Sequence, residues 1–254
     1  MKFSVLSSGS RANCTFVEAA GKRLLIDCGL SAKEAVRRLL HIGIEPSSID
    51  AIFVTHEHRD HIYGVPTFSR RFSVPVFVNK KTKLHLPRVH AFELFSAGEQ
   101  FEFEDISVLP ISIDHDAADP VAFHIRAEGL TFAHVTDLGC VNNTIKESLK
   151  NANALVIESN HDPELLRTCG YPWPLVQRIS SSTGHLSNET AASLIAEVIH
   201  GDMSHIILGH LSENSNTPDL ALRTFSEFVE PHARTVVTCA SVQKPTALFE
   251  MASC

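Results

Sequence analysis

The chain has 254 residues, 44% of them hydrophobic and 20% charged, which is the composition of an ordinary soluble globular protein with a buried core. Its formal net charge of −7 argues against a protein that binds nucleic acids over a broad basic surface. Apolar stretches are too short for a membrane span or a signal peptide, and the six cysteines form no CxxC pair, so we predict a cytoplasmic protein without a membrane partner.

Short apolar runs separated by polar and glycine-containing turns fill the first eighty residues. Ser31 is expected to begin a helix that continues to about His41, because Glu34 completes a capping box. The stretch 65–72 is either a short helix or irregular. The apolar runs predict strands over 3–6, 14–17, 23–26, 51–54 and 74–78.

Strand-like alternation dominates the middle of the chain, and helices and strands intermix after it. A run of antiparallel strands is predicted over 101–103, 106–113, 121–126 and 130–135. Later strands are predicted over 154–157, 205–208 and 235–238, and helices over 141–149, 163–167, 187–200 and 218–229. No repeat or linker interrupts this pattern, so we predict one domain over residues 1–254, with two sheets packed together and helices outside them.

A cluster of metal-ligand residues, from His56 to His61, directly follows the apolar strand over 51–54. Residues two apart in an extended segment point the same way, so His56 and His58 can bind one metal ion. Asp60 and His61 follow where the chain turns and can bind a second. Imidazole suits Zn and Fe, and a carboxylate brings Mn within range. The cluster predicts two divalent ions, Zn or Mn with Fe also compatible, whereas a merely histidine-rich polar loop is a poorer explanation of these spacings.

Three later residues meet the same test, because each follows an apolar strand. They are His115 after 111–114, Asp137 after 132–136, and His210 after 206–209. Any one of them alone is as readily an ordinary loop residue as a ligand. Together with the first cluster they predict a dinuclear centre of the kind that activates water and stabilises the charge of a displacement.

These motifs resemble those of the metallo-β-lactamase superfamily. The family's HxHxDH motif matches 56–61, and its early aspartate, which supports the metal loop, matches Asp27. The resemblance implies an α/β fold, the αββα four-layer sandwich of two mixed β-sheets flanked by helices. It also implies that His56, His58 and His115 bind one metal, that Asp60, His61 and His210 bind the other, and that Asp137 bridges both.

Further stretches narrow the resemblance to the YycJ/WalJ-like branch, which is related to tRNase Z and the β-CASP nucleases. They are 7–10 with Asn13 and Cys14, 136–139, 158–162, 184–188 and 210–214. This branch is associated with 5′-to-3′ exonuclease activity on DNA. The resemblance therefore implies a DNA substrate, although the acidic net charge counts against it.

The resemblance also implies roles for Glu158 and His185. His185 would protonate the leaving 3′-oxygen or hold the scissile phosphate, with Glu158 orienting it, and a histidine suits acid catalysis near neutral pH. Asp60 or Asp137 would orient the attacking hydroxide. The alternative for His185 is that it only helps to cap the next helix. Substrate contacts are a weaker expectation for Ser187, Asn188 and Arg59, because Ser187 and Asn188 also suit helix caps.

Several alternatives stay open at this point. A small-molecule hydrolase of the same fold, acting on a thioester, lactone, lactam or cyclic phosphodiester, would be favoured by a compact pocket without a basic rim. A di-iron oxidoreductase is disfavoured, because such family members commonly replace the second histidine, here His58. A non-catalytic scaffold is disfavoured by the intact ligand set. The stretch 171–174 could stack a base on Trp173 or pack that side chain inward. Metal identity, DNA against RNA, cleavage polarity, and monomer against dimer are undetermined by the sequence.

Overall fold

The computed structural model describes residues 1–230 and 235–251 and forms two compact units. The first unit comprises residues 1–112, 117–130 and the C-terminal segment from Ser241, and the second comprises 113–116 and 131–240. Each unit is therefore assembled from separate stretches of the chain. A single domain over 1–254 stays a prediction. In the part of the chain that the structure describes, no helix has the length and apolarity to cross a membrane.

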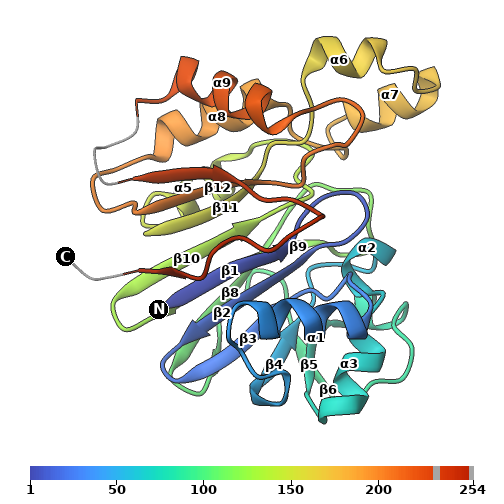
Figure 1. Ribbon diagram of the computed structural model, residues 1–254, viewed down its shortest axis with the longest axis vertical. Coiled ribbons are helices and arrows are strands. Elements are labelled where there is room, and N and C mark those ends of the chain that lie inside the picture. Colours follow the sequence, from blue (N-terminus) through green and yellow to red (C-terminus); the bar gives the residue numbers. More distant parts are fainter. Residues whose placement is uncertain (231–234, 252–254) are drawn as a thin grey trace. The chain divides into compact units, whose positions relative to one another are not determined.

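A seven-stranded mixed sheet forms the body of the first unit (Figure 1). Its order is β14-β1-β2-β3-β4-β5-β6, antiparallel from β14 to β3 and parallel from β3 to β6. The same unit holds an antiparallel group of β7, β8 and β9. These strands are β1 (Lys2–Ser7), β2 (Cys14–Ala19), β3 (Lys22–Ile26), β4 (Ala51–Phe53), β5 (Val76–Asn79), β6 (Phe92–Phe95), β7 (Phe101–Phe103), β8 (Ile106–Ser112), β9 (Val121–Ala127) and β14 (Phe249–Glu250).

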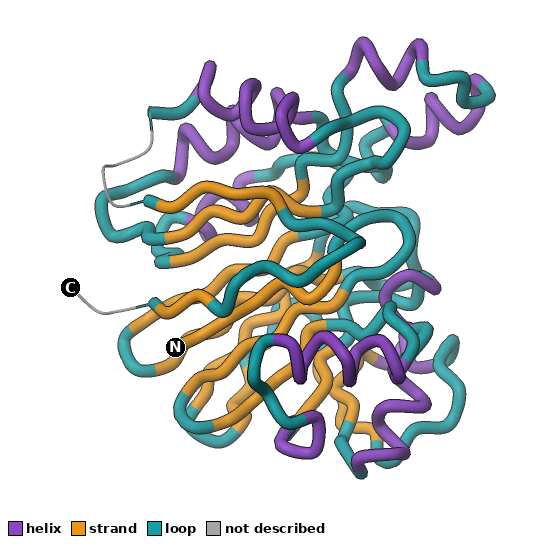
Figure 2. The backbone as a smooth tube through the Cα atoms, in the orientation of Figure 1, coloured by secondary structure: helices purple, strands orange, loops and turns teal. Residues whose placement is uncertain are grey.

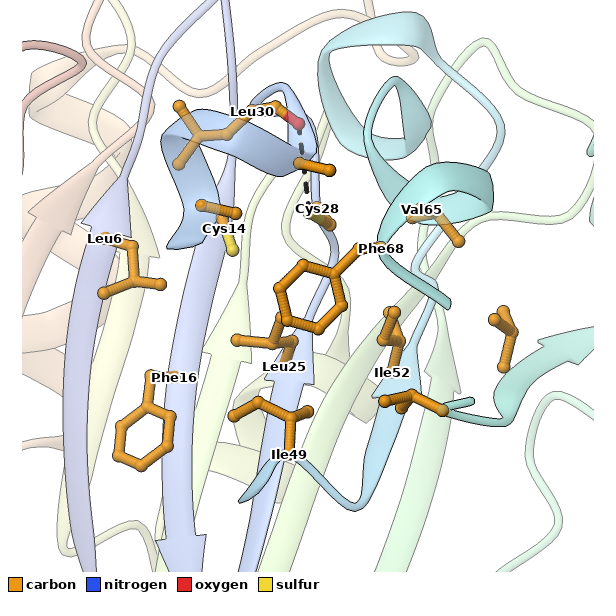
Figure 3. Packing of buried hydrophobic residues seen from close by; sticks show 14 of the residues in the cluster. Leu6, Cys14, Phe16, Leu25, Cys28, Leu30, Ile49, Ile52, Val65 and Phe68 are labelled. Carbon is orange, nitrogen blue, oxygen red and sulfur yellow. Dashed lines mark hydrogen bonds between the residues drawn. The ribbon is translucent and has the colours of Figure 1, made fainter. Parts of the chain in front are cut away.

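The longer helices of the first unit supply the apolar face that covers this sheet. The Ser31 hydroxyl accepts a hydrogen bond from the Glu34 N–H at 3.2 Å, so the predicted cap at the start of α1 is confirmed. Phe68 of α3 packs against Leu25 and Ile52 of the sheet (Figure 3). The helical segments of this unit are α1 (Ala32–His41), the short 3₁₀ turn Pro46–Ser48, α2 (Arg59–Ile62), α3 (Val65–Phe72) and α4 (Lys80–Lys83).

Four parallel strands, in the order β13-β12-β11-β10, form the body of the second unit. Helices connect them, and α8 packs beside α9 and α5 (Figures 1 and 2). Because the strands are parallel, their carboxyl ends meet at one edge, where ligands bind in open α/β sheets. The elements are β10 (Leu130–Val135), α5 (Asn143–Leu149), β11 (Ala154–Glu158), α6 (Pro163–Thr168), α7 (Trp173–Ile179), α8 (Asn188–Val198), β12 (His205–Gly209), α9 (Pro218–Phe228) and β13 (Val236–Cys239).

Most predicted elements are present, with shifts at their ends. Asn142 caps α5, so that helix begins at Asn143 rather than at 141. Residues 173–179 form the helix α7, which suits the proline at its second position. Trp173 begins that helix and is 65% exposed, so the alternative of an inward-packed tryptophan is wrong.

Candidate metal centre

Three imidazoles gather in the first unit on residues 55–61, hereafter the histidine loop. The loop follows β4 and turns into α2 at Arg59. The His56 ring centre lies 4.6 Å from that of His58 and 4.1 Å from that of His61. Asp60 Oδ2 lies 3.5 Å from His61 Nε2. The histidine loop thus brings together the four ligand-type residues that the sequence predicts there.

Asp27 supports the histidine loop from the neighbouring strand end. The parallel pairing of β3 with β4 puts Asp27 and Thr55 at the same sheet edge. Asp27 accepts hydrogen bonds at 2.8 Å from the Thr55 N–H and hydroxyl, and at 2.8 Å from His61 Nδ1. Because its hydroxyl proton goes to Asp27, Thr55 Oγ1 can accept from His56 Nδ1 at 2.9 Å. Both imidazoles therefore present Nε2 as the ligand nitrogen, the orientation that outer-shell partners impose at metal sites.

Asn13 was predicted only as part of a motif, yet it contacts the histidine loop directly. Its Nδ2 lies 3.1 Å from Asp60 Oδ2 and 2.9 Å from His61 Nε2, and its backbone N–H donates to the Asp60 carbonyl at 2.7 Å. Gly29 lies against the same carbonyl, because a Cβ there would come within 1.6 Å of Asp60 O. A glycine and an asparagine beside apolar strands were the only signals in the sequence, and neither identifies its partner.

The carboxyl edge of the second unit carries four more ligand-type residues. Asp137 follows β10, Glu158 ends β11, His210 follows β12, and His185 lies in the loop before α8. One ligand atom from each lies within 4.8 Å of the others. Asp137 and His210 have left-handed backbones, with φ of 58° and 53°, as does Asp27 of the first unit with φ of 59°. Such strained conformations concentrate at functional sites.

Asp137 lies between histidines from two different segments of the second unit. Its Oδ1 is 3.4 Å from His210 Nε2 and 3.7 Å from His115 Nε2. His115 Nδ1 faces the Gly184 carbonyl at 3.1 Å, so this nitrogen carries the proton and Nε2 keeps the lone pair with which an imidazole binds a metal. Asp137 thus lies between the two imidazoles, and its role as a bridging carboxylate stays a prediction.

Glu158 and His185 form a hydrogen-bonded pair at the same edge. His185 Nδ1 donates to Glu158 Oε1 at 2.8 Å, and the Glu158 side chain is fully buried whereas that of His185 is 17% exposed. Burial alone would lower the pKa of His185, but the Glu158 carboxylate raises it above its ordinary value. Burial would raise the pKa of Glu158, and His185 and His210 together lower it to about 2. The carboxylate therefore favours a protonated His185.

The three weaker substrate candidates lie in different settings. Arg59 is exposed, and its guanidinium carbon lies 5.0 Å from the centre of the Tyr63 ring. Ser187 is the N-cap of α8, accepting from the Thr190 N–H at 3.1 Å, as the capping interpretation expects. Asn188 is buried and accepts from the Ser159 hydroxyl at 2.6 Å, so its side chain is engaged inside the second unit.

The donor chemistry of each unit fits divalent metal ions. The histidine loop offers three imidazoles and a carboxylate, and the edge of the second unit offers imidazoles with carboxylates. Such nitrogen and oxygen donors suit Zn and Mn and are compatible with Fe.

Residues 22–210 match the model of the beta-lactamase superfamily domain. The chain is 40% identical to the exodeoxyribonuclease YycJ of Bacillus anthracis over 237 residues, 91% of this chain and 89% of that protein. It is 37% identical to the exodeoxyribonuclease WalJ of Streptococcus pneumoniae serotype 2 over 234 residues, 88% of this chain and 86% of that protein. The solved metallo-β-lactamase fold protein YhfI from Bacillus subtilis superposes with a TM-score of 0.71 at 17% identity, covering 96% of this chain and 98% of YhfI.

The likeness to YhfI shows the fold, and it confirms the predicted class, α/β with two mixed β-sheets flanked by helices. The family model spans most of the chain and includes every predicted metal ligand from His56 to His210. The two exodeoxyribonucleases match over almost their whole lengths. The chain therefore belongs to the metallo-β-lactamase superfamily, and within it to the branch of YycJ and WalJ.

Proposed function

We propose that this protein is a cytoplasmic exodeoxyribonuclease that hydrolyses single-stranded DNA from its 5′ end. Its family makes it a metal-dependent hydrolase. The names of the two relatives support DNA as the substrate. The observation that carries the proposal is the Glu158–His185 pair beside Asp137, since it provides a proton donor for a leaving alkoxide at a ligand-rich edge. The described cysteines are free thiols, which suits a reducing compartment.

The proposed centre holds two divalent ions, Zn or Mn. We assign His56, His58 and His115 to one ion, Asp60, His61 and His210 to the other, and Asp137 to both. The support is the family membership and the orientation of three imidazoles, because Nδ1 of His56, His115 and His61 faces Thr55, Gly184 and Asp27, respectively. When bound, the ions lower the pKa of a water molecule and stabilise negative charge on the phosphoryl oxygens.

The protein's own side chains complete the reaction. Asp60 or Asp137 accepts a hydrogen bond from the attacking water and orients it in line with the scissile bond. The new bond forms between the water oxygen and phosphorus as the bond from phosphorus to the 3′-oxygen breaks. His185, held through Nδ1 by Glu158, transfers its Nε2 proton to that departing oxygen. Glu158 is a positioning residue, because it acts through the imidazole.

A small-molecule hydrolase of the same fold is the rival reading. It would be favoured by a compact pocket without a basic rim. The cavity beside Asp60 instead has Arg11 and Arg59 among its lining residues. The presence of His58 counts against a di-iron oxidoreductase, as expected from the sequence.

The direct test is incubation of the metal-loaded protein with 5′-phosphorylated single-stranded DNA carrying a 3′ label. We expect stepwise loss of mononucleotides from the 5′ end. Bis(p-nitrophenyl) phosphate serves as a control that reports the metal centre without a nucleic acid. Cleavage of only this small ester would contradict the exonuclease function, and loss of the label as the first product would contradict the 5′ polarity.

A further inference from the structure

A cavity of about 380 Å³ opens on the first unit beside Asp60. It is bounded by the loop between β1 and β2, by Gly29, and by the first turn of α2. Its lining residues are Ser10, Arg11, Gly29, Arg59, Asp60 and Tyr63. The sequence predicted site roles for Asp60 and Arg59 among these, and Ser10 belongs to the motif over 7–10.

Two arginines and a hydroxyl give this cavity the chemistry of an anion site. The Arg59 guanidinium lies over the Tyr63 ring, and stacking uses the flat face of the guanidinium and leaves its N–H edge for a ligand. Arg11 is exposed in the opposite loop, next to Ser10. Asp60 is the one acidic residue in the lining. Its charge is offset under the proposed function, in which it binds a metal ion.

The cavity is fixed relative to the histidine loop. The Asn13 N–H donates to the Asp60 carbonyl at 2.7 Å, and the Gly29 N–H donates to the Asn13 carbonyl at 2.8 Å. Gly29 has no room for a Cβ against the Asp60 carbonyl. The backbone segments that carry Arg11 and Arg59 are therefore held beside the proposed metal ligand Asp60.

We propose that this cavity binds a phosphate of the DNA strand that does not itself react, adjacent to the phosphate undergoing hydrolysis. The inference rests on the proposed function. Arginine forks match phosphate oxygens in pairs, and phosphates recur at every nucleotide along a strand. The bound group is either the 5′-terminal monoester or an internal diester. The cavity would set the register of the strand, so that each turnover removes one nucleotide.

The test is the salt dependence of single-stranded DNA binding to the metal-loaded protein, measured by fluorescence anisotropy. Arg11→Ala and Arg59→Ala should each weaken binding about tenfold at low salt and reduce the slope of log K against log salt by about 0.7. Arg59→Lys should keep the slope, because it keeps the charge. Arg126→Ala, an exposed arginine of β9 outside the cavity lining, is the matched control and should leave both quantities unchanged.

DNA with and without a 5′-phosphate then separates the two sources of the anion. An arginine effect that requires the 5′-phosphate identifies the terminal monoester, and one that persists without it identifies an internal diester. Metal content of each variant is measured alongside. If both alanine variants bind with the slope of Arg126→Ala, the phosphate subsite is wrong, even where the wild-type protein digests DNA. Failure of the wild-type protein to digest DNA would instead overturn the proposed function.

Discussion

Each carboxylate oxygen of Glu158 contacts two partners within the second unit. Oε1 lies 2.8 Å from His185 Nδ1 and 3.0 Å from His210 Nδ1, while Oε2 accepts from the Leu138 and Leu186 N–H groups at 2.9 and 3.1 Å. The sequence could predict that Glu158 orients His185, because motif resemblance pairs the two. Its contact with His210 was beyond prediction, since it depends on the side-by-side placement of β11 and β12.

Replacing His185 by alanine should slow the chemical step without emptying the proposed metal site. We expect kcat on DNA to fall by about 10²-fold or more, because a proton donor to the leaving oxygen is lost. Two ions per chain should remain by elemental analysis. His205→Ala is the matched control, because His205 begins β12 at the end opposite His210. Full activity of His185→Ala would remove the proposed acid role, and loss of metal would reassign His185 as a ligand.

At the scale of elements, the buried strands were predictable and the one-turn helices were not. The runs over 51–54 and 154–157 are apolar throughout because both faces of those strands are covered. The helices α2 and α4 have four residues each, too few for a 3.6-residue periodicity to show. The attachment of α1 to the sheet could not be predicted either, because it joins residues far apart in the sequence. Arg38 of α1 donates to the backbone oxygens of Leu6 and Val242 at 2.6 and 2.8 Å.

The attachment of α1 through Arg38 should weaken at acid pH, because Glu34 loses its negative charge there. Hydrogen bonds from Arg37, and then from Arg38, lower the pKa of Glu34 to about 2. The folded-state pKa is below the ordinary 4.5, so the stabilisation is present above pH 4.5 and is lost as the pH falls toward 2. Glu34→Gln should lower the free energy of unfolding by about 1–2 kcal/mol at pH 7.

Urea unfolding of wild type and Glu34→Gln over a pH series checks this, with the gap between them narrowing below pH 4.5. Glu227→Gln, at an exposed position of α9, is the control and should leave the free energy of unfolding unchanged at every pH. A gap that stays constant down to pH 3 would show that the carboxylate charge of Glu34 does not contribute.

For the whole molecule, the fold class could be predicted from motifs but the boundaries of the two units could not. The C-terminal segment returns to the first unit, where Phe249 pairs with Phe3 in the sheet, and no local pattern indicates this return. The candidate ligand residues could be predicted because the histidine loop, His115, Asp137 and His210 each follow an apolar strand. Asn13 and Gly29 could not, because their roles depend on the close approach of a distant backbone.

Metal removal should destabilise the protein if the assigned histidines and carboxylates bind the ions, as proposed. A chelator should lower Tm by about 5–10 °C relative to protein with metal in hundredfold excess over its Kd, and added Zn or Mn should restore it. Calorimetry measures both. Asp137→Asn should show a smaller shift, because the proposed bridging carboxylate is lost. An unchanged Tm on chelation would contradict the proposed metal centre.

The left-handed backbones of Asp137 and His210 bear on how distant sequences of this fold are interpreted. That conformation costs an L-residue about 1–2 kcal/mol, less for aspartate, and it costs glycine almost nothing. A descendant chain that no longer needed its metals would gain stability by mutating these two positions to glycine, and the strands before them would be unaffected. Glycine after both strands would therefore indicate a chain that keeps the fold but no longer binds metal ions. Asp27 would not be replaced by glycine in such a chain, because its carboxylate connects the end of β3 to the histidine loop through Thr55.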